Sequence, residues 1–213
     1  MSSTRCGISA KQLEREIGVT YKTAHRMFKQ IRTLLQEGPE DPLGGKVEMD
    51  ETLIGGKPRL GQVRNRREIR QFVEKKAKVF AAVERGGRVR ARVIPNRSGE
   101  VLREQARELV LPSSMVFTDD YRLYVSVGRS FSQHHRINHS AKIYVDGDVH
   151  TQTVEGFFSL LKNGLRGVYH SVSSEYLQDY VNEYAWRYSH RNDERPMFLT
   201  ILGLTIPPAS QAA

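Results

Sequence analysis

The sequence predicts an α/β protein, in which a mixed five-stranded sheet with flanking helices follows a small helical segment. Two helix-forming runs open the chain, β-rich runs follow a linker rich in proline and glycine, and amphipathic helices close it. The length of 213 residues suits one domain of roughly 150 residues with a small appendage.

Residues 9–35 have the pattern of two helices joined by a tight turn. Ser9 is a suitable N-cap with Gln12 three residues later, and Gly18 interrupts the pattern before the second helix. This is helix-turn-helix spacing, and a plain helical hairpin with a solvated basic face is the alternative. The expected apolar seam comprises Leu13, Ile17, Val19, Ala24, Phe28 and Ile31. The expected DNA-binding residues on the opposite face are Tyr21, Lys22, His25, Arg26 and Lys29.

The rest of the chain divides at a linker. Residues 36–45 contain two prolines and three glycines, so we expect a helix-turn-helix segment at 1–36, a linker at 37–46, a catalytic domain at 47–200 and a C-terminal tail at 201–213. Strands are expected at 46–54, 78–84, 88–94, 114–118 and 135–138, and helices at 98–111, 151–163 and 174–190. The basic segment 58–76 is expected to be mobile or to face DNA.

Net charge, cysteine content and the length of apolar runs limit the classes of protein to which this chain can belong. The formal net charge of +9 indicates a polyanionic partner, with a basic ribosomal or solubility-driven surface as the alternative. A single cysteine, Cys6, excludes a disulfide framework and fits a reducing cytoplasm. No run approaches the roughly 18 apolar residues of a membrane span, so we expect a cytoplasmic, nucleoid-associated protein that makes no membrane contact.

Three acidic residues stand at positions typical of a metal-dependent nuclease. Asp50 lies within the first expected strand, Asp119 ends the fourth, and Glu155 lies on the helix that follows. Each alone is more often a solvated surface group or part of a turn. Together, in this order of strands and helices, they describe an RNase H-like core, in which carboxylates hold two hard cations at one phosphodiester.

The helix that carries Glu155 has a polar and an apolar side. Lys162 lies two turns after Glu155, on one face with Ser159 and Arg166, where basic groups would hold the DNA backbone. The expected apolar stripe comprises Val154, Phe158, Leu161 and Leu165. His150 and His170 flank this region and would contact DNA or serve in capping and packing.

Longer motifs resemble those of the ISXO-type insertion-sequence transposases. They are Val47–Lys57, Val149–Lys162, Gly167–Val172 and Asn182–Arg191. The resemblance implies a DDE transposase that hydrolyses DNA at the ends of its element and joins the freed 3′-hydroxyl to target DNA. It assigns Asp50, Asp119 and Glu155 as catalytic metal ligands, with Lys162 as the associated basic residue. It also implies Mg²⁺, with Mn²⁺ as a substitute, and a homodimer or larger assembly on double-stranded DNA.

The sequence departs from that family at two points. Related sequences usually have asparagine where Gln152 stands, which leaves Gln152 as a rival to Glu155 for the third catalytic position. One cysteine cannot build the zinc ribbon that often precedes the helix-turn-helix, so we expect a shortened copy. The alternatives are an idle DNA-binding remnant that represses its parent element, and a related nuclease such as an RNase H or a Holliday-junction resolvase.

Overall fold

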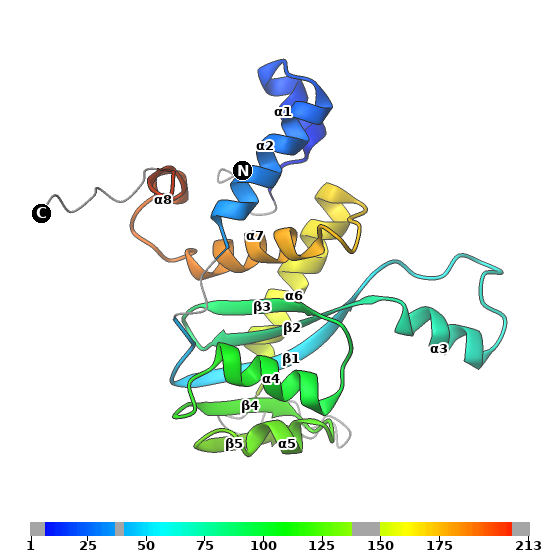
Figure 1. Ribbon diagram of the computed structural model, residues 1–213, viewed down its shortest axis with the longest axis vertical. Coiled ribbons are helices and arrows are strands. Elements are labelled where there is room, and N and C mark those ends of the chain that lie inside the picture. Colours follow the sequence, from blue (N-terminus) through cyan, green and yellow to red (C-terminus); the bar gives the residue numbers. More distant parts are fainter. Residues whose placement is uncertain (1–6, 37–40, 138–149, 206–213) are drawn as a thin grey trace, which may run out of the picture. The chain divides into compact units, whose positions relative to one another are not determined.

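The computed structural model describes residues 7–36, 41–137 and 150–205 (Figure 1). The chain forms two compact units. Residues 39–159 form the sheet unit, and residues 1–38 with 160–213 form the helical unit. Part of the predicted linker and the end of the predicted tail lie outside the described residues. None of the described helices is long and apolar enough to span a membrane.

The sheet unit contains the mixed five-stranded sheet that the sequence predicts. Its strands follow the order β3-β2-β1-β4-β5, with β1, β2 and β3 antiparallel and β4 and β5 parallel to β1. The strands are β1 (Lys46–Ile54), β2 (Ala77–Glu84), β3 (Val89–Ile94), β4 (Met115–Asp119) and β5 (Gln133–Ile137). Each predicted strand therefore exists, with bounds that differ by at most two residues over the described chain.

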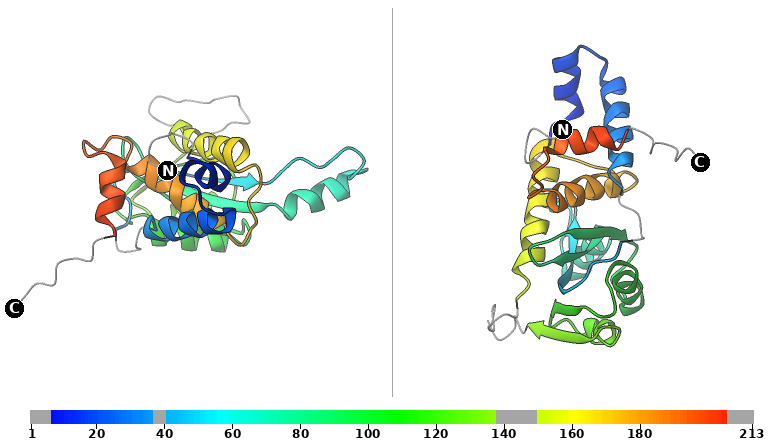
Figure 2. Two further views of the ribbon diagram at one scale, coloured as in Figure 1. Left: turned by 90° about the horizontal axis from the view of Figure 1, so that it is seen from above. Right: turned by 90° about the vertical axis from the view of Figure 1, so that its left-hand side faces the viewer.

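Helices cover both faces of this sheet. Figures 1 and 2 show α4 (Gly99–Leu109) and α5 (Tyr124–Gly128) on one face, and the first turns of α6 (Gln152–Gly164) on the other. Alternation along β1 assigns Val47 and Met49 to the α4 face, where they join a buried apolar cluster with Leu102 and Ala106. The residues between them, Glu48 and Asp50, consequently belong to the face that α6 covers.

Two helices of the sheet unit were not predicted. The five-residue α5 is too short to show a period. The predicted mobile or DNA-facing segment contains α3 (Arg66–Glu74), which begins at an N-cap. There the Asn65 side chain accepts a hydrogen bond from the Glu68 N–H (2.9 Å), and Glu68 accepts one from the Asn65 amide (2.9 Å). These reciprocal bonds give the segment helical order that its composition did not indicate.

The helical unit contains the two helices predicted near the start of the chain. They are α1 (Ala10–Ile17) and α2 (Tyr21–Leu34). Ser9 caps α1, as predicted, and Gly18 ends it in the left-handed conformation (φ 71°), which glycine adopts without strain. Ala24 and Phe28 are buried as predicted, but Ile17 is 50% exposed. Ile17 was therefore wrongly assigned to the apolar seam.

The remaining elements of the helical unit follow α6. They are the π-helix η2 (Leu165–Tyr169), α7 (Leu177–Ser189) and α8 (Met197–Gly203). The predicted helix at 174–190 is confirmed as α7, whereas η2 and α8 were not predicted. On α7, Tyr180, Val181 and Tyr184 are buried.

A buried carboxylate, Glu183 on α7, joins three elements of this unit. It accepts hydrogen bonds from Arg32 of α2 (Nε, 2.8 Å), from Arg187 of α7 (Nη2, 3.0 Å) and from the hydroxyl of Tyr169 (3.2 Å). The Arg32 guanidinium also lies 3.9 Å from the ring centroid of Tyr180. Arg32 is thus a buried cation whose charge is paired within the unit.

We expect Glu183→Gln to destabilise the protein. The substitution keeps the shape of the side chain but leaves Arg32 and Arg187 buried without a counter-charge, which costs about 3–5 kcal/mol. This corresponds to a fall in Tm of about 6–20 °C, measured by calorimetry or circular dichroism. Glu175→Gln, an exposed glutamate of the same unit, is the control and should change Tm by about 2 °C or less. An equal Tm for both variants would contradict the role of the network.

Candidate functional site

The carboxylates of Asp50 and Asp119 lie on adjacent parallel strands. The pairing of β1 with β4 includes Glu48 opposite Phe117, so two residues further along each strand Asp50 comes level with Asp119. Residues two apart on a strand share a face, and Glu48 faces the start of α6. Asp50, in the middle of β1, and Asp119, at the end of β4, therefore lie on the α6 face of the sheet.

The pKa of Asp50 reflects this convergence. Burial above all, together with the negative charges of Glu51, Asp119 and Glu155, raises the pKa of Asp50 to about 8. One hydrogen bond, from the Glu51 N–H to Asp50 Oδ1 (2.8 Å), acts in the opposite direction. Asp119 and Glu155 are thus near enough to Asp50 for their charges to act on its carboxyl group.

A fourth carboxylate, Glu51, adjoins this group and was not predicted. Its side chain is 6% exposed, accepts a hydrogen bond from the Tyr124 hydroxyl (2.6 Å) and lies 3.6 Å from Arg97 Nη1. Burial raises the pKa of Glu51; burial and then the charge of Glu51 raise the pKa of the Tyr124 hydroxyl. Consecutive acids inside a strand, Asp50-Glu51, were the one sequence signal that would have identified it.

Helix α6 is held against β1 by the fully buried carboxylate of Glu48. Glu48 Oε2 accepts hydrogen bonds from the backbone N–H groups of Thr153 (2.7 Å) and Val154 (3.0 Å), and Oε1 accepts one from the Thr153 hydroxyl (2.8 Å). These N–H groups lie in the first turn of α6, where they have no partner within the helix. A strand residue therefore caps the helix that carries Glu155.

Arg85, in the turn between β2 and β3, neutralises Glu48. Its Nε lies 2.8 Å from Glu48 Oε1, its Nη2 donates to the carbonyl of His150 (2.9 Å), and its guanidinium lies 4.0 Å from the ring centroid of Phe117 on β4. His150 Nδ1 is 3.1 Å from the same Glu48 oxygen. Of the two roles expected for His150, the contacts favour packing and capping.

The other predicted site residues on α6 lie along its exposed side. Glu155, Gln152 and Ser159 are exposed, whereas Val154 and Phe158 of the predicted apolar stripe are buried. Glu155 Oε1 accepts a hydrogen bond from the Thr151 hydroxyl (3.2 Å). Lys162 lies past the boundary of the sheet unit, in the part of α6 that belongs to the helical unit. The role assigned to Lys162 beside the carboxylates stays a prediction.

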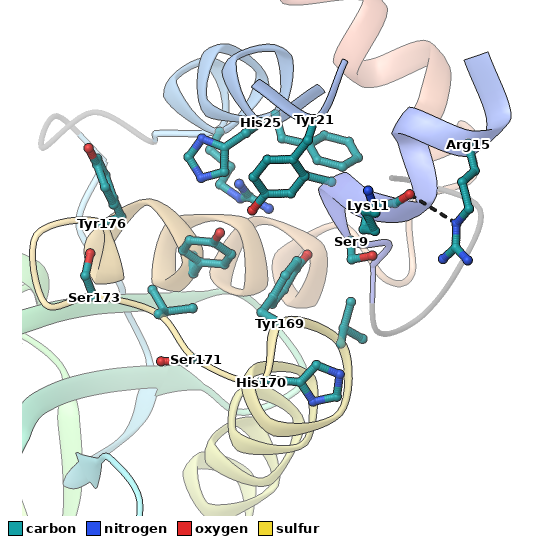
Figure 3. Close-up of a pocket in the computed structure, with 16 residues that line it drawn as sticks. Ser9, Lys11, Arg15, Tyr21, His25, Tyr169, His170, Ser171, Ser173 and Tyr176 are labelled. Carbon is teal, nitrogen blue, oxygen red and sulfur yellow. Dashed lines mark hydrogen bonds between the residues drawn. The ribbon is translucent and has the colours of Figure 1, made fainter. Parts of the chain in front are cut away.

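In the helical unit, the predicted DNA-binding residues divide into two groups. Lys22, Arg26 and Lys29 are exposed on α2. Tyr21, which is also exposed, and the half-buried His25 line a cavity of about 470 Å³ between α1, α2, the 168–173 segment and α7 (Figure 3). The His25 ring centroid lies 6.1 Å from those of both Tyr21 and Tyr176, so the aromatic side of α2 is directed at its own unit.

Arg166 and His170 lie at the same unit's π-helix. Arg166 is exposed on η2, and its carbonyl oxygen lies 3.0 Å from His170 Nδ1. His170 adopts a positive φ of 58°, which is uncommon for a residue with a side chain. It also borders the cavity that Tyr21 and His25 line (Figure 3).

The donor set of the sheet unit suits hard divalent cations. Asp50, Asp119 and Glu155 offer carboxylate oxygens, the ligands that Mg²⁺ and Mn²⁺ prefer, and a cation beside them would relieve the repulsion that raises the pKa of Asp50. Within the described ranges, no three or more His, Cys, Asp or Glu side chains are gathered as closely as a metal site requires. The chemistry of the residues fits the ions, although their side chains are not arranged as a coordination sphere.

We expect Glu48→Gln to loosen the start of α6. The substitution keeps one acceptor but removes the charge that strengthens the bonds to the Thr153 and Val154 N–H groups. Loss of a helix cap costs about 0.5–2 kcal/mol, so hydrogen exchange of these amides should accelerate by about 2- to 30-fold. The measurement is hydrogen–deuterium exchange of residues 151–158. Glu100→Gln, in the first turn of α4, is the control, and unchanged exchange in Glu48→Gln would disprove the capping role.

We expect Asp50→Asn to change how stability depends on pH. The pKa of Asp50 is about 8 in the folded state and about 3.8 in the unfolded chain. Between these two pH values the folded protein retains a proton that the unfolded chain loses. Its contribution to stability is therefore complete below about pH 4 and is lost as the pH rises through about 8. The substituted asparagine carries no charge, so the variant should have the higher Tm at pH 8.5, by about 2 °C or more, and a smaller advantage at pH 5. A constant difference in Tm across this pH range would refute the raised pKa.

Comparisons with known proteins identify the family. The ISXO2-like transposase domain matches residues 42–189, a range that includes Asp50, Asp119 and Glu155. An uncharacterized protein in transposable element ISH50 of Halobacterium salinarum is 30% identical over 199 residues, which cover 86% of this chain and 65% of the relative. An uncharacterized transposase-like protein of Haemophilus influenzae is 30% identical over 98 residues, which cover 46% of this chain and 78% of the relative. This chain thus spans just under two thirds of the Halobacterium relative, and it belongs to the ISXO2-like family of insertion-sequence transposases.

Proposed function

We propose that this chain cuts DNA at the ends of its insertion sequence and joins the freed 3′-hydroxyl to target DNA. The observation that carries the proposal is the placement of Asp50 and Asp119 level with each other on adjacent strands, with Glu155 on the helix that Glu48 holds against the same face. Family membership supports the DNA substrate. The order β3-β2-β1-β4-β5, with acids on β1, at the end of β4 and on α6, supports an RNase H-like assignment for the sheet unit.

In this proposal, the three carboxylates would hold divalent cations, Mg²⁺ or Mn²⁺. When bound, such ions supply Lewis acidity at the phosphate and make the attacking oxygen a better nucleophile. The carboxylates of Asp50 and Asp119, fixed on two hydrogen-bonded strands, set one side of the site. Glu155 sets the other side, because Glu48 fixes the first turn of α6.

The proposed reaction needs no covalent intermediate between the protein and DNA. In the first step the oxygen of water attacks the phosphorus, the bond from phosphorus to the 3′-oxygen breaks, and the leaving oxygen takes up the proton that the attacking water gives up. In the second step the resulting 3′-hydroxyl attacks a target phosphodiester in the same manner. The chain's contribution is to hold the reacting atoms in line, with Lys162 and Arg166 assigned to the DNA backbone.

We also assign DNA binding to a helix-turn-helix formed by α1 and α2. Its exposed cations are Lys22, Arg26 and Lys29, whose side chains suit phosphate contacts. Each chain carries one set of catalytic carboxylates, whereas an element has two ends. Joining both ends therefore calls for a dimer or a larger assembly on DNA.

The test compares two residues three positions apart on α6, Glu155 and Gln152. Glu155→Gln removes the negative charge that a divalent cation requires, so cleavage should fall about 100-fold or more, since a metal contributes several kcal/mol to the barrier. Gln152→Ala should lower the rate by about tenfold at most, as expected for a residue that supports the site indirectly. The measurement is Mg²⁺- or Mn²⁺-dependent cleavage of DNA that carries the sequences flanking the gene.

Three outcomes separate the alternatives. Full activity of Glu155→Gln, with the loss confined to Gln152→Ala, would move the third catalytic position to Gln152. DNA binding by the unchanged protein without any cleavage would favour the idle repressor remnant. Cleavage of branched junctions or of RNA–DNA hybrids in preference to element ends would favour a related nuclease.

A further inference from the structure

The segment between β1 and β2 extends away from the sheet and carries α3 (Figure 1). We define the arm as residues 55–76. None of these residues is buried, in contrast to the strands that the arm connects. The arm therefore contributes very little to the core of the sheet unit.

The arm holds most of the net charge of the protein. Its eight basic and two acidic residues give a net charge of +6, two thirds of the +9 of the whole chain. Seven of the eight basic residues are exposed, and Lys76 is half-buried. The basic residues are Lys57, Arg59, Arg64, Arg66, Arg67, Arg70, Lys75 and Lys76.

These charges are not neutralised within the part of the chain that the structure describes. No ion pair involves any of the eight, whereas Arg85, Arg97 and Arg136 of the same unit each lie within 4 Å of a carboxylate. The acid of the arm nearest to them, Glu68, is engaged with the N–H of Arg64 (2.7 Å) and with the Asn65 cap. Like charges so close together repel, and a polyanion would relieve that repulsion.

Helix α3 gives the charges a fixed arrangement. At 100° per residue, Arg66, Arg67 and Arg70 lie on one side of the helix, and the partly exposed apolar residues Ile69 and Phe72 lie on the other. Arg66 and Arg70 are one turn apart, about 6 Å along the axis. Guanidinium groups at this spacing are suited to neighbouring phosphates, which they bind through two parallel hydrogen bonds.

We infer that the arm binds the phosphate backbone of duplex DNA through Arg66, Arg67 and Arg70. The inference rests on the proposed function, which makes DNA the substrate, and adds a contact that is independent of base sequence and separate from the α2 surface. A second copy of the chain is the less suitable partner for this side of α3, because two arms of charge +6 repel each other.

The test measures how DNA affinity depends on salt in the full-length chain. The probe is a labelled duplex of arbitrary sequence, and the variant is Arg66→Gln/Arg67→Gln/Arg70→Gln. Loss of about three phosphate contacts should lower the slope of log K against log salt by about 2–3 and raise Kd at about 0.1 M salt tenfold or more. The control, Arg103→Gln/Arg107→Gln/Arg129→Gln, removes the same charge from α4 and from the end of α5, and should change the slope by about 1 or less.

The outcomes distinguish the inference from the proposed function. An unchanged slope in the arm variant, or an equal change in the control, would overturn the inference while leaving the proposed function intact. Failure of the unchanged protein to bind any DNA would overturn both. Ile69→Ser, on the apolar side of α3, should leave DNA binding unchanged. If the arm variant alters the sedimentation of the free protein and not the salt slope, the arm contacts a second copy and the DNA assignment is wrong.

Discussion

The bond between the buried Glu48 carboxylate and the first turn of α6 is the contact on which the candidate active site depends. Helix N-termini present N–H groups without partners, and a carboxylate satisfies them well because it also complements the helix dipole. Glu48 and Asp50 are neighbours on the same face of β1. One strand thus both anchors the helix that carries Glu155 and supplies the carboxylate that Glu155 must approach.

The helical unit is organised in the same manner around Glu183. In both units a fully buried glutamate is paired with arginine, through Arg85 in one and through Arg32 and Arg187 in the other. Such pairs add little net stability, because desolvation offsets their attraction, but a member left alone is costly. They therefore disfavour any arrangement in which one partner is buried without the other. Both glutamates fall in motifs that resemble those of the family, which gives these motifs a structural purpose beside any catalytic one.

The positive charge of the protein is distributed unevenly, and its location says more about where a partner would bind than the net charge does. The arm alone accounts for +6, while Arg85, Arg90 and Arg97 of the sheet unit are engaged with carboxylates or with a carbonyl group. Negative charge is concentrated as well, around Asp50. The partners proposed above, DNA and divalent cations, would neutralise the positive and the negative charge respectively.

The strands and most of the helices could be predicted from the sequence, because alternation, helical period and capping residues are local properties. The choice of Asp50, Asp119 and Glu155 came from their order along the chain and from the family resemblance, and it stays a prediction. The sequence did not reveal the burial of Arg32, the capping role of Glu48 or the burial of Glu51 next to Asp50. Each of these depends on partners distant in the chain, since Glu48 meets Thr153 105 residues away and Arg32 meets Glu183 151 residues away. Helix α3 was also not predicted, because the segment was interpreted from its basic composition and the N-cap at Asn65 was not considered. Tertiary structure decided which charged side chains are buried, since only a specific partner offsets the cost of removing a charge from water.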